Sequence, residues 1–173
     1  NMSDTGHISF VGSLSRGPDV PLTDDLPARS FDLPGLVPGE EVAIGWVISD
    51  EYIAEHGMSD TWQAFNGTWQ PFFRREVLDD GSLDIPTRAD ALVRDSASYR
   101  VETGYLREVG VQDLSISTVV SWSDAWSNDR SHAVRMHQVA DAWVRNVHSY
   151  ESENSRDQRA RHLQSGGVMV VDS

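Results

Sequence analysis

One histidine and one aspartate stand four residues apart in the segment 134–147, as His137 and Asp141. On a strand the two side chains share a face about 13 Å apart, too far for a hydrogen bond but suited to flanking a ligand. On a helix they lie side by side, and the carboxylate would hold the histidine tautomer for general base work. The alternative to acid/base chemistry is an ordinary surface histidine and a surface aspartate.

Other reaction types lack the residues that they need. The chain has no cysteine, and its six histidines form no His-x-x-x-His pair, so we expect no thiolate chemistry and no bound metal. Gly-x-Gly-x-x-Gly, Gly-x-x-x-x-Gly-Lys and Gly-x-Ser-x-Gly motifs are absent from the sequence. We therefore expect neither a nucleotide cofactor nor a serine nucleophile.

A hairpin is the element that would position His137 and Asp141. Apolar residues alternate with small polar ones from Leu114 to Trp122, which indicates a strand. A turn at 127–130 would lead into a second strand over 134–147, although its spacing also fits one face of an amphipathic helix. Antiparallel pairing about the turn would place Leu114 opposite Trp143 and Val120 opposite His137. Catalytic residues of the resulting pocket are predicted as Asp141 and His137, with Trp122, Trp143, Tyr105, Arg135 and Val120 as substrate-binding residues.

Three short helices are predicted ahead of that sheet. Residues 42–48 form an apolar run typical of a buried strand, and Ser49 is a helix N-cap for residues 51–56. Ser59 or Asp60 would cap a second helix, and Thr87 with Asp90 resembles a capping box for a third helix that reaches Ser96. The second helix is expected to carry a buried stripe at intervals of three and four residues, made of Trp62, Phe65, Trp69, Phe72 and Phe73.

The predicted organisation is one α+β domain over 42–150, with short helices packed on a curved, mainly antiparallel sheet. Residues 1–41 contain all but two of the seven prolines and are expected to be an extended arm with a short strand at 7–11. Residues 151–173 would be a polar extension, and no internal repeat is recognised. Its apolar end, Val168–Val171, is either an edge strand or a contact for a partner subunit, which would allow a homo-oligomer.

Charge restricts the partners. All basic residues are arginine, and the formal net charge is −13. Such a field repels nucleic acid and anionic membrane. No apolar stretch of membrane-spanning length and no signal-peptide pattern is seen, so the cytoplasm is the expected location.

Two short motifs resemble a known family. Asp80-Gly81 followed by Thr87–Leu92, and later Ala140–Arg145, are similar to motifs of the cone-shaped α+β family that includes nuclear transport factor two and the SnoaL-type polyketide cyclases. The resemblance implies a hydrophobic cone in which an Asp or His acts as general acid/base, usually without cofactor. Asp141 matches the late-strand motif, and His137 would lie deeper on the same strand.

Three functions follow as hypotheses. The first is a cofactor-independent cyclase, isomerase or dehydratase that acts on a small hydrophobic metabolite. The second is a noncatalytic protein that binds a small molecule, and the third is an assembly or virion-type structural protein. All three depend on the fold of residues 134–147.

Overall fold

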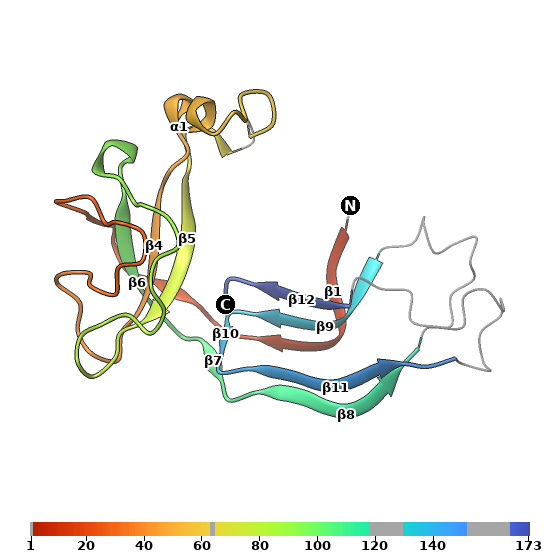
Figure 1. Ribbon diagram of the computed structural model, residues 1–173. Helices are drawn as coiled ribbons and strands as arrows, with labels where there is room; N and C mark the ends of the chain where they lie inside the picture. Colours follow the sequence, from red (N-terminus) through yellow and green to blue (C-terminus); the bar gives the residue numbers. More distant parts are fainter. Residues whose placement is uncertain (1, 63–64, 118–129, 152–166) are drawn as a thin grey trace. The chain divides into compact units, whose positions relative to one another are not determined.

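The computed structural model describes residues 2–62, 65–117, 130–151 and 167–173. It divides into two compact units: unit 1 comprises residues 1–14 and 104–173, and unit 2 comprises residues 15–103 (Figure 1). Strands dominate both units, and the described residues contain a single α-helix. The predicted α+β class with several helices on a sheet is therefore wrong. The borders between the units follow residues 14 and 103.

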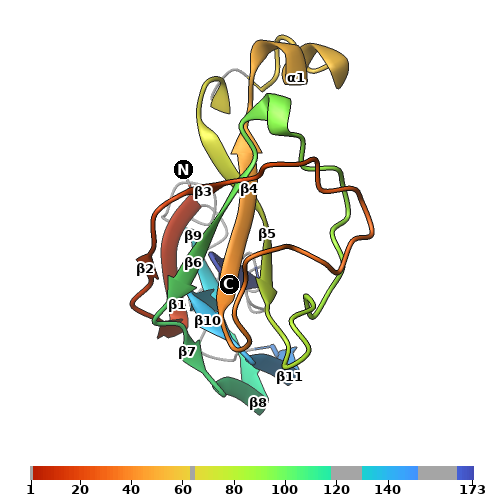
Figure 2. The same ribbon diagram turned by 90° about the vertical axis from the view of Figure 1, so that its left-hand side faces the viewer.

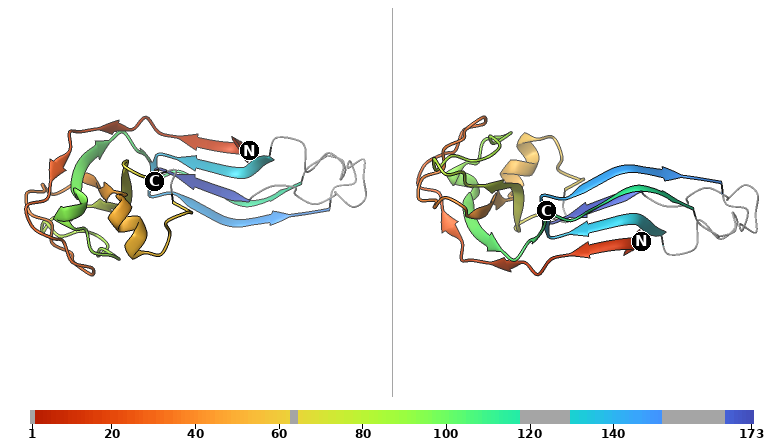
Figure 3. Two further views of the ribbon diagram at one scale, coloured as in Figure 1. Left: turned by 90° about the horizontal axis from the view of Figure 1, so that it is seen from above. Right: turned by 90° about the horizontal axis from the view of Figure 1, so that it is seen from below.

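Unit 1 is built from strands that pair only in parallel among its described residues (Figures 1 and 3). Its strands are β1 (Met2–Val11), β7 (Leu106–Arg107), β8 (Gly110–Ile116), β9 (Arg130–His137), β10 (Val139–Ala140), β11 (Trp143–Ser149) and β12 (Val168–Val171). They form one sheet in the order β1-β9-β12 and two pairs, β7 with β10 and β8 with β11. Parallel neighbours that recur in chain order define successive coils of a β-solenoid.

The register shows a coil length of 33 or 34 residues. Val139 lies opposite Leu106 and Val147 opposite Leu114, both offsets of 33 residues. Val168 lies opposite Val134, an offset of 34 residues. Between residues 105–116 and their partners 138–149, only Val111 and Val144 are identical, so the structural repeat leaves almost no trace in the sequence.

Unit 2 is inserted into the first coil. Ile8 lies opposite Val134, an offset of 126 residues that exceeds one coil of 33 by 93. The chain leaves and re-enters the solenoid at one point, where the amide of Ser13 donates to the carbonyl of Gly104 over 3.0 Å. Adjacent chain ends are typical of a domain inserted into another fold.

The coils bend at stacked residues with positive φ. The equivalent positions are Glu108 and Asp141 at one corner, Gln138 and Asp172 at another, and Asp113 and Asn146 within β8 and β11. Asp and Asn tolerate this left-handed region better than most residues. At each such position the alternation of side chains between the two faces of the strand is interrupted, so apolar residues before and after the position can both point into the coil. The buried core of unit 1 consists of Val111, Ala133, Val134, Met136 and Val139.

The predicted hairpin is wrong. Val147 of β11, and not Trp143, lies opposite Leu114, and the two strands run parallel. The segment 134–147 is extended, which agrees with the predicted strand and not with the alternative helix. Gln138 and Asp141 divide it into β9, β10 and β11. The predicted strands at 7–11 and 168–171 are confirmed within β1 and as β12. Of the turn predicted at 127–130, residues 127–129 lie outside the described residues, and Arg130 begins β9.

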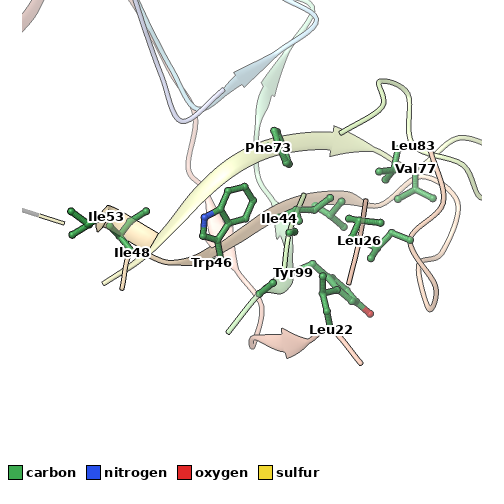
Figure 4. Close-up of a cluster of buried hydrophobic side chains, with 14 residues drawn as sticks. Leu22, Leu26, Ile44, Trp46, Ile48, Ile53, Phe73, Val77, Leu83 and Tyr99 are labelled. Carbon is green, nitrogen blue, oxygen red and sulfur yellow. The ribbon is translucent and has the colours of Figure 1, made fainter. Parts of the chain in front are cut away.

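Unit 2 is an antiparallel sheet with the central strands β4 and β6 (Figure 2). Its elements are β2 (Ser15–Arg16), β3 (Val20–Pro21), β4 (Glu41–Val47), α1 (Asp50–Glu55), β5 (Trp69–Glu76), the 3-10 helix η2 (Val93–Asp95) and β6 (Ser98–Thr103). The order is β2-β6-β4-β5, so β5 is an edge strand, and β3 pairs with β6. The buried strand at 42–48 is confirmed by β4, whose Ile44 is fully buried in the core (Figure 4).

Where the structure describes the three predicted helices, only the first forms an α-helix. Ser49 accepts a hydrogen bond from the amide of Tyr52 and caps α1, as predicted. The second is wrong from Trp69 onward, because these residues pair with β4 as β5. Among the described residues, no helix is long and apolar enough to cross a lipid bilayer.

The third predicted helix is replaced by a loop whose side chains hold the N-terminal arm. The hydroxyl of Thr87 donates to the carbonyl of Pro27 and accepts from the amide of Ser30. Asp90 accepts from the amide of Ala28. The capping-box pair therefore bonds a distant segment, and only η2 is helical there. The arm packs onto unit 2 through the buried side chains of Leu22, Leu26 and Leu33.

Candidate binding site

Asp141 occupies an exposed corner of the solenoid. Its side chain is 56% exposed and forms an ion pair with Arg107, Oδ2 to Nη1 2.5 Å. Arg107 belongs to β7, the strand that pairs with β10 in the next coil. Asp141 has a positive φ, and it is paired with Arg107 of the neighbouring coil. These two features give Asp141 a structural role at the corner.

His137 is paired with other groups. Arg135 Nη2 lies 3.0 Å from His137 Nδ1, and Asp172 Oδ2 lies 3.6 Å from His137 Nε2. With Arg135 as donor, Nδ1 accepts and the neutral imidazole carries its proton on Nε2, toward the carboxylate. That tautomer leaves no unused lone pair for a general base. His137 and Asp141 thus have different partners.

The remaining predicted pocket residues that the structure describes, Trp143, Tyr105 and Arg135, occupy separate positions in unit 1. Trp143 is 44% exposed, and its ring covers the space that a side chain at Gly110 would need. Tyr105 is half-buried and immediately precedes β7. Val120 and Trp122 lie outside the described residues. The inward positions of β9 are instead Val134 and Met136, which fill the solenoid core.

Unit 2 contains a surface hollow of about 260 Å³, called here the aromatic hollow. Its lining residues are Ile48, Trp62, Phe65, Gln70, Pro71 and Phe72. They come from the residue after β4, the segment that follows α1, and the first half of β5. The Phe65 and Phe72 side chains are 50% and 40% exposed, so two large apolar groups border this hollow in contact with solvent. Exposed aromatics around a concave surface are typical of ligand sites.

A β-bulge in β5 positions Phe72. Gly45 pairs with Pro71 while Ile44 pairs with Phe73, so Phe72 is the extra residue of the edge strand. A side chain at position 45 would overlap the carbonyl oxygen of Gln70, and glycine there lets the two strands approach. Pro71 is tolerated because an edge strand has no ladder to complete on its outer side.

Trp46 forms the support beneath the bulge. The Phe72 ring stacks on the Trp46 indole with centroids 3.9 Å apart and planes at 11°, and Phe73 contacts the same indole edge-on at 5.8 Å. Trp46 itself is 2% exposed. The Phe72 ring is therefore held by a buried neighbour on one face, with the other face turned away from Trp46.

Rings from helix α1 lie near the rings of the aromatic hollow. The Tyr52 ring lies 6.1 Å from that of Trp62 and 6.4 Å from that of Phe72. His56 Nδ1 donates to the Tyr52 carbonyl over 2.8 Å, and its ring lies 5.7 Å from that of Trp62. A continuous set of rings thus connects α1 to β5.

The sequence predicts a buried helical stripe for these aromatics, and that prediction is wrong for Phe65 and Phe72. Only Phe73 of the predicted stripe belongs to the buried core, and Phe65 and Phe72 are exposed. One signal was available: a proline inside an aromatic-rich segment, Pro71 among Trp69–Phe73, is typical of an edge strand or a bulge.

Comparison with known proteins gives no family for this chain: no family model and no curated protein matches it.

Proposed function

We propose that unit 2 binds a small organic ligand in the aromatic hollow and does not convert it. The observation that supports this proposal is the composition of the lining. Five of the six described lining residues are apolar or aromatic, and the sixth, Gln70, supplies an amide that can donate and accept hydrogen bonds. An apolar wall with one orienting polar group suits recognition.

Catalysis would need an acid, a base or a nucleophile within about 3 Å of the ligand. None of the described residues that line the hollow has a carboxylate, imidazole, hydroxyl or amine side chain. Asp141 and His137 are not among the described residues that line the hollow, so their acid/base role remains a prediction. This contrast favours the binding hypothesis over the cyclase or isomerase hypothesis.

The size of the hollow limits the ligand. Sites for drug-sized ligands usually span about 300–1,000 Å³. At about 260 Å³, the hollow fits one ring or one branched headgroup. We expect affinity to be modest, because an open site of this size buries little ligand surface.

The test is ligand-dependent thermal stabilisation of the full chain with a panel of small amines, alcohols and acids. A stabilising ligand should lose its effect in Phe65→Ala, since this ring borders the hollow but is absent from the hydrophobic core. Phe31→Ala is the matched control, because Phe31 is 47% exposed and does not line the hollow.

Mass spectrometry of the incubated ligand separates binding from turnover. Recovery of the unchanged ligand is the expected result. Formation of a product, or equal stabilisation of Phe65→Ala and the unmodified chain, would contradict the proposal.

A further inference from the structure

We infer that the ligand of the aromatic hollow is an organic cation, a small ammonium compound with apolar substituents. This inference rests on the proposed function and names its ligand class. It depends on two independent properties of unit 2, the ring faces that line the hollow and the distribution of charge around it.

Charge is concentrated in unit 2. Residues 15–103 contain 17 Asp and Glu residues and 7 Arg residues, a formal charge of −10 out of −13 for the chain. The potential of this unit is therefore strongly negative and attracts small cations.

Most of the positive charge of unit 2 is already engaged elsewhere. Two arginines, Arg16 and Arg74, bind the buried carboxylate of Glu102 at 3.3 and 3.0 Å. Arg94 binds Glu55, and Arg100 binds Asp19. No arginine is among the described lining residues of the hollow, so nothing positive there competes with a cationic ligand.

Carboxylates adjoin the rings in the sequence and in space. Asp50 accepts a hydrogen bond from the side-chain amide of Asn66 over 2.6 Å, which ties the start of α1 to the residue after Phe65. Glu51 precedes Tyr52, and Asp60 stands two residues before Trp62. Both side chains are exposed, and neither is among the described residues that line the hollow.

Aromatic faces supply the second property. The face of an aromatic ring is electron-rich, and a cation within about 6 Å of a ring centroid is attracted to it, most strongly by Trp. The hollow offers Trp62, Phe65 and Phe72. A neutral ligand and a cationic ligand with the same apolar groups could both pack on these rings, but only the cation also gains from the negative charge of unit 2.

The experiment compares choline with its uncharged isostere 3,3-dimethyl-1-butanol, which has the same shape, by NMR titration of the full chain. Choline should bind about tenfold more tightly than the isostere at low salt, and the difference should shrink at high salt. Phe65→Ala should abolish choline binding, and Phe31→Ala should leave it unchanged.

A second pair of variants tests the local charge. Glu51→Gln with Asp60→Asn should weaken choline binding several-fold and leave binding of the isostere unchanged. Asp24→Asn with Asp79→Asn removes the same total charge from exposed loops that do not line the hollow, and should have little effect.

The outcomes separate the two proposals. Equal or tighter binding of the neutral isostere overturns the cation inference and leaves the binding function in place. Absence of choline binding also overturns the cation inference, and the wider panel then decides the binding function. Equal weakening by the two charge pairs shows that only the net charge acts, which contradicts a cation held in the hollow.

Discussion

Units 1 and 2 bury the faces of their strands in opposite ways. In unit 1 each coil pairs in parallel with an equivalent stretch about 33 residues away, and outward polar residues meet equivalent ones, as Asn146 meets Asp113 at 2.8 Å. In unit 2 the strands pair antiparallel, and a bulge leaves Phe72 exposed on an edge strand. Unit 1 pairs equivalent polar residues along its stack, whereas in unit 2 two exposed rings, Phe65 and Phe72, border the aromatic hollow.

This difference supports the proposal that the binding site lies in unit 2. Stacked coils constrain every position by its neighbours above and below, so a change at one position affects the adjacent coils. An inserted unit attached at Ser13 and Gly104 is free of that constraint. Binding sites are often placed on irregular segments held by a regular scaffold, and the aromatic hollow fits this pattern.

Gly12→Ala is expected to destabilise unit 1 more than any other change considered for it. A side chain at position 12 would overlap the carbonyl oxygen of Gln138 in the adjacent coil. Because this neighbour is backbone, the strand must shift, and we expect a loss of about 1–3 kcal/mol in the free energy of unfolding. Amide hydrogen exchange should locate the loss in β9 and β10.

Gly17→Ala in unit 2 is the matched control. Its added carbon would lie 3.1 Å from the nearest atom, the carbonyl oxygen of Val101, so a shift of a few tenths of an ångström suffices. A smaller loss, confined to unit 2, is expected. Equal losses in the two variants would show that the solenoid is no more tightly constrained than the insertion.

A buried carboxyl in unit 2 gives a prediction in which a substitution raises the stability of the chain. Asp95 is 6% exposed, and burial, opposed by the nearby Arg94, raises the pKa of this carboxyl above its ordinary 3.8. The folded state then binds the proton more tightly than the unfolded state, so stability falls as the pH rises from 3.8 through the raised pKa. Asp95→Asn removes this loss, and its advantage in melting temperature over the unmodified chain should grow toward neutral pH.

Asp19→Asn is the control for the sign. The hydrogen bond from Arg100 lowers the pKa of the Asp19 carboxyl, so its contribution to stability is present above the ordinary pKa and is lost as the pH falls through the lowered value. This variant should be less stable than the unmodified chain at neutral pH and equal to it in acid. An advantage of Asp95→Asn that shrinks with rising pH would mean that attraction by Arg94 outweighs burial.

Local signals in the sequence predicted local structure. Ser49 caps α1 because its hydroxyl needs only a partner three residues away. The apolar run after Val42 forms β4, since a short continuous run of this kind suits a strand buried on both faces.

The sequence does not specify which distant strands pair with each other. Strands of alternating pattern do not specify whether they pair parallel or antiparallel, and the hairpin prediction chose the nearest partner for the strand at Leu114. The repeat that would have identified the coils is carried by the shape of the backbone at Asp113 and Asn146, not by residue identity. Likewise, Thr87 satisfies the pattern of a helix cap but bonds Pro27, 60 residues away.

The smallest expected effect concerns Asp141, at which the structural and catalytic interpretations of unit 1 diverge. Asp141→Asn removes the half-exposed ion pair with Arg107 but keeps a residue type that accepts the left-handed φ of 51°. We expect a loss of about 0.2–1 kcal/mol that disappears at high salt. Urea denaturation in low and high salt measures it.

Asp141→Ala distinguishes backbone from charge at the same corner. Alanine loses the ion pair and also places a side chain poorly suited to positive φ in the stack, at a further cost of about 1–2 kcal/mol that salt does not change. If instead Asp141→Asn and Asp141→Ala were equally stable, and both abolished conversion of a ligand that the unmodified chain transforms, the corner would be a catalytic position. The regular unit would then carry chemistry, and the contrast between a scaffold and a functional insertion would fail.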